Sequence, residues 1–230
     1  TVLPERPFVA NLCRDRVRFA VALLAAMLRG QCTLLPNDRT ERVLRALAES
    51  HPGLYGLADE TQTVGGGPLY AAEAPPLPPQ PVPAFPDPAE IPAARPVLRL
   101  FTSGTTGEPV PADRRWDHCA AGVDLTLRRL AGGMAAGSPA GASLVATVPS
   151  QHSYGLENAI LLPLLAEIAV HPGCPFYPAD VAAVLAELPP PRLLVTTPVH
   201  LRALAESRAA LPPLAAIVSA TADLPLELAR

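Results

Sequence analysis

The stretch Leu100–Pro109, with the sequence LFTSGTTGEP, decides the fold class of this chain. It continues an apolar run that begins at Val97 and is typical of a buried strand. The strand leads into a loop that combines hydroxyl side chains with glycines. Glycine allows close backbone approaches that a Cβ would forbid, and hydroxyl and backbone N–H groups together can wrap an anion such as a polyphosphate. We therefore predict a phosphate-binding loop after this strand, formed by Thr102, Ser103, Gly104, Thr105, Thr106 and Gly107.

This loop is not a Walker A loop, in which four residues separate two glycines and a lysine follows the second. Gly104 and Gly107 are closer together, and no lysine follows them. The ordered string Thr-Ser-Gly-Thr-Thr-Gly-Glu-Pro instead resembles the phosphate loop of the adenylate-forming superfamily, which includes acyl-CoA synthetases and peptide-synthetase adenylation domains. The alternative is an ordinary turn of glycine and threonine after a strand.

Composition excludes several classes of protein. The chain has 230 residues, of which 49% are hydrophobic and 17% charged, so it is not a disordered polyelectrolyte. Its net charge of −3 and pI of about 5.9 give no reason to expect a nucleic acid as partner. All 18 basic residues are arginine, so no site in this chain can use a lysine.

The cysteines and the longest apolar stretch indicate a cytoplasmic protein. The four cysteines are far apart and form no CxxC pair, which argues against a zinc ribbon or a disulfide framework and is typical of a reducing compartment. The apolar stretch Phe19–Leu28 is too short to span a bilayer. We therefore expect neither a membrane nor a nucleic-acid partner.

The chain reads as α/β, with mainly parallel sheet layers covered by helices. In the first segment, residues 1–59, Asp15 is expected to cap a helix that Gly30 ends. A strand at 32–35 and a helix at 40–49 follow. In the second segment, residues 60–96, eleven of the thirty prolines fall between Pro68 and Pro96, which predicts a linker or a loosely packed excursion.

The third segment, residues 97–230, alternates short apolar runs with helical patterns, which indicates βαβ units. In such sheets ligands bind at the carboxyl ends of the strands, where the predicted phosphate loop lies. The predicted strands are 97–102, 144–148, 167–170, 193–196 and 215–218. The predicted helices are 114–131, 157–166, 179–188, 198–206 and from 224 onward.

Two further motifs follow predicted strands of this segment. Pro149–Glu157, PSQHSYGLE, resembles a phrase of the superfamily in which proline precedes a histidine and an aromatic residue that line the acyl pocket. His152 matches that histidine, and Tyr154 and Gly155 are candidates for the pocket wall. A lone histidine in a loop is more often structural, but its pairing with the phosphate loop favours a catalytic role for His152.

The other motif runs from Ile217 to Leu224. It is similar to the superfamily phrase SGAAPL, whose small residues let the backbone approach adenine and substrate. Ser219, Ala220 and Thr221 match it in size, although the usual glycine is absent. The remaining histidines show no metal-binding spacing, so we expect no metal ligand among them and assign them structural or solvated roles; they are His51, His118, His171 and His200.

The sequence departs from the superfamily in two respects. Val110 stands where a lysine usually follows the loop, and Arg114 and Arg115, which we expect to begin the next helix, are the only cations near it in sequence. The resemblance also covers only the front half of such an enzyme. The later glutamate that helps to hold magnesium, the ribose-binding aspartate and the C-terminal domain with its lysine are not in this sequence.

The resemblance implies an N-terminal fragment of a ligase that uses ATP and Mg²⁺ to convert a carboxylic acid to an acyl-adenylate. The acyl group then passes to the thiol of CoA or of a carrier protein. The phrases around Thr102 and His152 look most like ligases found beside pigment-polyene or fatty-acid synthesis genes, which implies an aryl or fatty acid. We expect the fragment alone to be inactive. A catalytically inactive relic, an interaction module and a different α/β enzyme remain alternatives.

Overall fold

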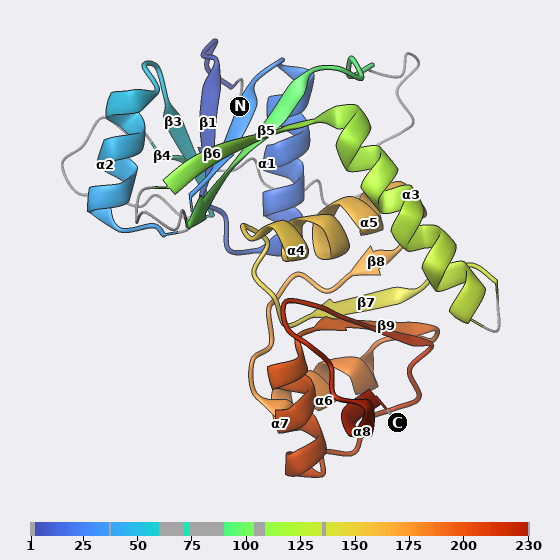
Figure 1. Cartoon of the computed structure of the whole chain (residues 1–230). Helices are drawn as coiled ribbons and strands as arrows, with labels where there is room; N and C mark the ends of the chain where they lie inside the picture. The colour runs from blue at the N-terminus through green and yellow to red at the C-terminus, as the bar shows by residue number, and fades with distance from the viewer. Residues whose placement is uncertain are drawn as a thin grey trace. The chain divides into compact units, whose positions relative to one another are not determined.

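The computed structural model describes residues 3–36, 38–59, 71–73, 90–103, 109–134 and 137–229, and for residues 71–73, 102, 103 and 109 the backbone alone. The chain divides into two compact units, Thr1–His118 and Cys119–Arg230, each with its own sheet (Figure 1). The boundary predicted at residue 97 does not coincide with this division, because the strand that begins there belongs to the sheet of the first unit.

The first unit contains a six-stranded sheet in the order β4-β3-β1-β2-β5-β6. All neighbouring strands are parallel except β5 and β6, which form an antiparallel pair. The strands are β1 (Phe8–Asn11), β2 (Cys32–Leu35), β3 (Tyr55–Ala58), β4 (Ala71–Glu73), β5 (Pro96–Ser103) and β6 (Pro109–Arg115). The helices that begin in this unit are α1 (Arg16–Leu28), α2 (Glu41–Ser50) and α3 (Trp116–Gly133).

The sequence predicted the beginning and end of α1. The Asp15 side chain accepts a hydrogen bond from the Arg18 backbone N–H at 2.8 Å, and thus satisfies one of the donors that a helix start leaves unpaired. Gly30 has a φ of +74°, a conformation that glycine adopts without a Cβ penalty and that ends the helix. The predicted strand at 32–35 and the predicted helix at 40–49 are also confirmed.

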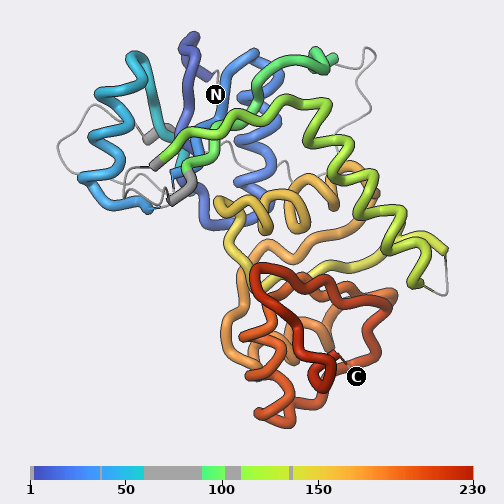
Figure 2. The backbone as a smooth tube through the Cα atoms, in the orientation of Figure 1, coloured from blue at the N-terminus to red at the C-terminus, as the bar shows by residue number. Residues whose placement is uncertain are grey.

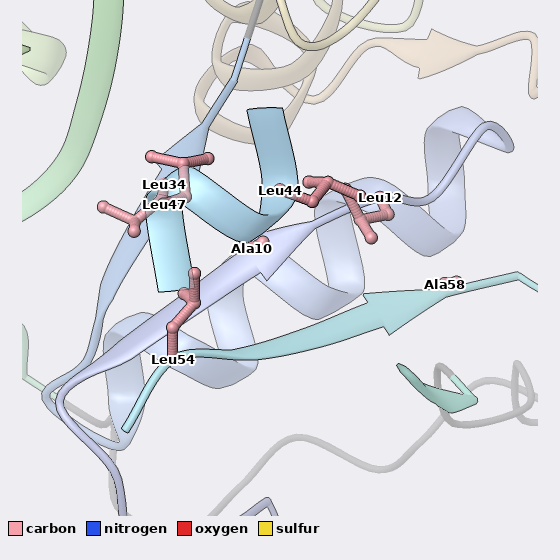
Figure 3. Close-up of a cluster of buried hydrophobic side chains, with 7 residues drawn as sticks. All are labelled: Ala10, Leu12, Leu34, Leu44, Leu47, Leu54 and Ala58. Atoms are coloured by element: carbon pink, nitrogen blue, oxygen red, sulfur yellow. The ribbon is translucent and has the colours of Figure 1, made fainter. Parts of the chain in front are cut away.

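The core of the first unit lies between the sheet and α2. Seven buried apolar side chains from β1, β2, α2 and β3 and their flanking residues form one cluster (Figure 3), made of Ala10, Leu12, Leu34, Leu44, Leu47, Leu54 and Ala58. Because side chains alternate across a strand, Asn11 faces the other side, where its amide donates to the Phe19 carbonyl of α1 at 2.9 Å. The two helices therefore cover opposite faces of the sheet.

The second unit contains a four-stranded parallel sheet in the order β10-β9-β7-β8. Its strands are β7 (Ser143–Ala146), β8 (Ala169–Val170), β9 (Arg192–Thr196) and β10 (Ala216–Ser219). Its helices are α4 (Ser153–Leu156), the π-helix η1 (Glu157–Leu161), α5 (Leu162–Ala166), α6 (Pro178–Glu187), α7 (Pro198–Ser207) and α8 (Leu226–Ala229). The tube in Figure 2 follows this alternation of strand and helix.

Helices cover both faces of this sheet. Val145 of β7 and Leu194 of β9 pack with Val181 and Leu185 of α6 and with Leu204 of α7. In Figure 1, α4 and α5 lie on the other face, and η1 contacts β7. β7 and β9 are buried and mostly apolar, as strands covered on both faces are, and the sequence located both. It also located β5, β8 and β10 from their apolar residues, although β8 and β10 are partly exposed strands at the edges of their sheet.

Other elements were not expected from the sequence. β1, β3 and β4 were not predicted, and β4 lies within the segment that we assigned to a linker. The helix predicted to start at residue 157 begins earlier, at Ser153. The prediction that Arg114 and Arg115 begin a helix is wrong: both lie on β6, and α3 starts at Trp116. β6 is polar because it pairs with β5 alone, at the edge of its sheet.

The four cysteines form no disulfide with one another. Burial raises the pKa of Cys13 to about 12, and the nearby Asp59 carboxylate adds to the effect. Burial likewise raises the pKa of Cys32 to about 11. Both thiols therefore stay protonated at neutral pH. Within the described ranges, no helix has the length and apolar character needed to cross a membrane.

Candidate functional site

The candidate site is built on the carboxyl edge of the second sheet. β7, β9 and β10 are parallel neighbours, with Ala146 paired to Val195 and Thr196 paired to Ser219. Their last residues therefore lie in adjacent positions along one edge. The segments that leave this edge carry two of the predicted motifs, His152 to Gly155 after β7 and Ser219 to Thr221 after β10.

His152 lies where the sequence predicted, in the connection that follows β7. Its side chain is exposed, and it immediately precedes α4. The sequence suggested that the neighbours Tyr154 and Gly155 are loop residues. In the structure they lie within α4. The π-helix η1 continues α4, and such π-helical turns occur frequently at functional sites.

Gly155 makes the close approach that fixes this connection. A Cβ built at Gly155 would lie 2.0 Å from the carbonyl oxygen of Pro149 and 2.9 Å from its carbonyl carbon. No side chain fits in this space, so only glycine allows α4 to pack against the end of the segment after β7. The glycine thus positions His152, and its role is in the backbone.

Tyr154 is held from both neighbouring strands. Its hydroxyl donates toward the carbonyl oxygen of Thr196 at 3.0 Å, at the end of β9, and that of Val218 at 2.8 Å, in β10. Burial raises the pKa of Tyr154 to about 12, and a backbone hydrogen bond with Thr196 opposes this only in part. The phenol therefore remains protonated and holds α4 against the two strands, which is a positioning role. The place of Tyr154 in the wall of the acyl pocket stays a prediction.

The third motif contains a buried polar atom and a strained backbone. Among the described residues, the Ser219 hydroxyl oxygen is buried without a hydrogen-bond partner. Thr221 has a φ of +82°, which is disfavoured for a β-branched residue. Strained backbone of this kind clusters at functional sites. Here it occurs in the turn that follows β10.

Sequence analysis missed His200, which joins the polar atoms at this edge. Its Nδ1 lies 2.8 Å from the Thr147 hydroxyl oxygen, and that oxygen lies 2.8 Å from the hydroxyl oxygen of Thr196. We had assigned His200 to the structural or solvated histidines. One feature of the sequence could have indicated His200. It follows a predicted strand closely, as His152 does.

The predicted phosphate loop closes the β5–β6 hairpin of the first unit. Gly104, Thr105, Thr106 and Gly107 lie outside the described residues. On either side of them, Ser103 pairs with Pro109 and Thr102 with Val110.

The ion pair between Arg99 and Asp113 fixes the register of this hairpin. The two residues face each other across the strands, with 2.6 Å from Nε to Oδ1 and 2.8 Å from Nη2 to Oδ2. The hydrogen bonds from Arg99 lower the pKa of the Asp113 carboxyl, so the pair stays charged at neutral pH. The third Arg99 nitrogen, Nη1, lies 3.0 Å from Nε2 of the buried His51.

Comparisons with solved structures identify the fold. A malonyl-CoA ligase, in a ternary product complex with methylmalonyl-CoA and AMP, matches with a TM-score of 0.68 and 23% identity over 96% of this chain and 47% of that ligase. The o-succinylbenzoate CoA synthetase of Bacillus subtilis, in complex with its acyl-adenylate intermediate, matches with a TM-score of 0.71 and 19% identity over 96% and 45%. An acyl-CoA synthetase of Brucella canis matches with a TM-score of 0.72 and 16% identity over 98% and 44%.

This chain has the fold of the adenylate-forming enzymes. The predicted α/β class and the resemblance to part of their N-terminal domain are thereby confirmed at the level of fold. The chain spans just under half the length of each of these three ligases. Searches of its sequence against family models and against curated proteins find no match.

Arg114 and Arg115 lie at the end of β6 that is away from the predicted loop. Arg114 pairs with Leu98, four residues along β6 from Val110, which is roughly 14 Å at the ordinary rise of a strand. Arg115 forms an ion pair with Asp117. Val110, in contrast, lies opposite Thr102 at the base of the loop.

The described part of the chain offers no ligand set for Mg²⁺. No three side chains among its His, Cys, Asp and Glu residues are placed to hold a metal ion. Magnesium therefore remains an implication of the resemblance, and we derive no step through it.

We predict that Gly155→Ala destabilises the protein. The new Cβ must displace the Pro149 carbonyl, which costs about 1–3 kcal/mol, as overpacking of a filled site does. Gly122→Ala on α3 is the matched control, because nothing lies within 4 Å of its Cβ position and alanine gains about 0.5–1 kcal/mol in a helix interior. Urea unfolding measures whether each substitution lowers or raises the free energy of unfolding. Equal stability of the two variants would contradict the close approach at Gly155.

We predict that Thr221→Gly stabilises the protein by about 1 kcal/mol. Glycine removes the cost of a positive φ, which outweighs the greater flexibility that it gives the unfolded chain. Thr221→Ala is the control: it keeps a Cβ and should recover only part of this gain. Thermal unfolding measures the difference, and a Thr221→Gly variant less stable than Thr221→Ala would show that the turn is not strained.

Proposed function

We propose that the chain forms the acid- and phosphate-binding part of an AMP-forming acid–thiol ligase. In the proposed reaction, a carboxylate oxygen attacks the α-phosphorus of ATP, the bond to pyrophosphate breaks, and an acyl-adenylate forms. A thiolate of CoA or of a carrier protein then attacks the acyl carbon, and AMP leaves. The observation that carries this proposal is the match of 96–98% of the chain to CoA ligases, with the His152 motif on the carboxyl edge of its sheet.

The residues divide between the two substrates. The hydroxyl and glycine loop from Thr102 to Gly107 would hold the β- and γ-phosphates through backbone and hydroxyl donors. The turn from Ser219 to Thr221 would lie against the nucleotide and the acid, and the unpartnered hydroxyl of Ser219 supports a polar ligand there. His152 would lie beside the reacting carboxylate, in the position that Gly155 and Tyr154 fix.

The physical problem of the reaction is that two anions must meet. Preorganised donors that neutralise the charge of the transition state are the largest catalytic contribution in such cases, and alignment of the reacting atoms adds to it. We further propose that the acid is an aryl or fatty acid, on the strength of the sequence resemblance alone.

We predict that the 230-residue chain binds ATP but does not catalyse acid-dependent exchange of pyrophosphate into ATP. The reason is that it spans less than half of each of the three ligases described above. A longer polypeptide that continues this chain should catalyse the exchange with an aryl or fatty acid. Exchange assays with both proteins test this prediction. Exchange by the 230-residue chain alone would show that the prediction is wrong. Failure of the chain to bind ATP would refute its phosphate loop.

We predict that Val110→Lys tightens ATP binding. A lysine at the base of the loop would place an ammonium group near the phosphates, and a charge-assisted hydrogen bond contributes on the order of 1–3 kcal/mol, or about 5- to 150-fold in Kd. Arg114→Ala is the matched control and should leave Kd unchanged, because Arg114 lies far along the strand. Calorimetric titration of ATP decides, and a weaker Kd for Arg114→Ala would show that this arginine reaches the nucleotide.

A further inference from the structure

Three polar side chains form a continuous hydrogen-bonded chain at the carboxyl edge of the second sheet. Thr196 and Thr147 come from the ends of the neighbouring strands β9 and β7, and His200 from the first turn of α7. The two hydroxyl oxygens are 2.8 Å apart, and His200 Nδ1 is 2.8 Å from that of Thr147. Thr196 is 0% exposed and Thr147 is 3% exposed, so their hydroxyl groups are shielded from bulk water.

The number of hydrogens in this chain fixes the protonation of His200. Each hydroxyl has one hydrogen to donate, and within the described residues the Thr196 hydroxyl has only that of Thr147 as its partner. If Thr196 donates to Thr147 and Thr147 donates to His200 Nδ1, every hydrogen has an acceptor. The reverse order leaves the buried Thr196 hydrogen without one, which is unfavourable. Nδ1 is therefore the acceptor, and the proton of the neutral ring is on Nε2.

Two exposed aromatic side chains lie beside this imidazole. The Phe176 ring packs edge-on against His200, with 5.1 Å between ring centroids, and Tyr177 packs edge-on against Phe176 at 5.4 Å. Phe176 and Tyr177 are 62% and 67% exposed. We call these two residues the apolar patch. An exposed apolar cluster beside a fixed polar group is typical of a ligand site.

The patch and His200 lie on the same edge as His152. Phe176 and Tyr177 precede α6 in the connection that follows β8, and Val199 and His200 follow β9. Thr147, to which His200 is bonded, begins the segment that leads from β7 to His152. Ligands of parallel sheets bind at this edge.

We propose that His200 is a specificity-determining residue that donates its Nε2–H to an oxygen atom in the acyl part of the acid, remote from the reacting carboxylate. The favoured acid carries a hydroxyl or carbonyl oxygen on an aryl or alkyl group that packs on the apolar patch. A neutral N–H donor beside aromatic side chains suits an uncharged oxygen, with which it forms an ordinary hydrogen bond. This inference rests on the proposed function and goes beyond it in naming the substrate class.

The first measurement needs no ligand. Nitrogen NMR of the 230-residue chain, labelled with ¹⁵N at its five histidines, reports which ring nitrogen of the neutral His200 carries the proton. We expect Nε2–H in the wild type, and a mixture of tautomers in Thr147→Val, which removes the partner of Nδ1. The exposed His118 is the internal control and should not change. An Nδ1–H ring in the wild type would overturn the proposal.

The second measurement compares acids of equal shape. The pairs are 4-acetylbenzoate with 4-isopropylbenzoate, and 7-oxooctanoate with 7-methyloctanoate, in which a carbonyl oxygen replaces a methyl group. In the pair that fits the site, His200→Phe should reduce the preference for the carbonyl acid about 3- to 10-fold in the ratio of Kd values, the effect of one hydrogen bond. His200→Gln, which keeps an N–H at the position of Nε2, should retain part of it.

The outcomes separate this proposal from the one on which it rests. If the ratio of Kd values within each pair of acids is the same in the wild type and in His200→Phe, the proposed role of His200 is wrong. The ligase assignment is not affected by that result. Failure of all four acids to bind, to this chain and to a longer polypeptide that continues it, would remove both. If His200→Phe does not fold, two other results decide: the tautomer of His200 in the wild type, and the ratio of Kd values in the wild type and in His200→Gln. An Nδ1–H ring in the wild type contradicts the proposal. So does the absence of any preference for the carbonyl acid in the wild type or in His200→Gln.

Discussion

The parallel register of β7, β9 and β10 is the constraint on which the site depends. It brings the ends of three strands to one edge, although their residues are far apart in sequence. Tyr154 can bond to the carbonyls of Thr196 and Val218 only because β9 and β10 are paired in this register. Thr147 reaches Thr196 for the same reason. A slip of one residue would turn these side chains to the opposite face of the sheet, so the hydrogen bonds and the hydrophobic core favour the same register.

The sequence predicts the elements whose signal is local. β7 and β9 are continuous apolar runs because both faces are buried, and α1 carries its own cap and stop in Asp15 and Gly30. β6 lacks such a signal, since its sequence PVPADRR contains two prolines and ends in three charged residues, and it becomes a strand by pairing with β5. The two arginines were misplaced for this reason. β1 and β3 were also not predicted, and they become strands through parallel pairing with partners elsewhere in the chain, β1 with β2 and β3 with β1.

The candidate site shows the same division. The position of His152 after a strand could be read from the sequence, because a parallel sheet displays its connections at a known edge. The surroundings of the site could not be read, since they rest on partners 49 and 53 residues away. Nor does the sequence reveal that Gly155 packs against a carbonyl oxygen and not against a ligand. Motifs thus locate a site of this kind, and long-range contacts determine what each of its residues does.

Thr221 and Val110 are unusual for different physical reasons. At Thr221 the backbone keeps a conformation that suits glycine while the side chain makes it unfavourable, so the turn is imposed by its surroundings, namely the end of β10 and the start of α8. At Val110 the backbone is an ordinary strand paired with Thr102, and what is missing is a charge. The residue at Thr221 therefore bears on the stability of a turn. The residue at Val110 bears on charge at the base of the β5–β6 connection and not on the pairing of the two strands. In the proposed ligase, the first position would affect the shape of the turn after β10, and the second would affect how strongly the predicted phosphate loop holds its anion.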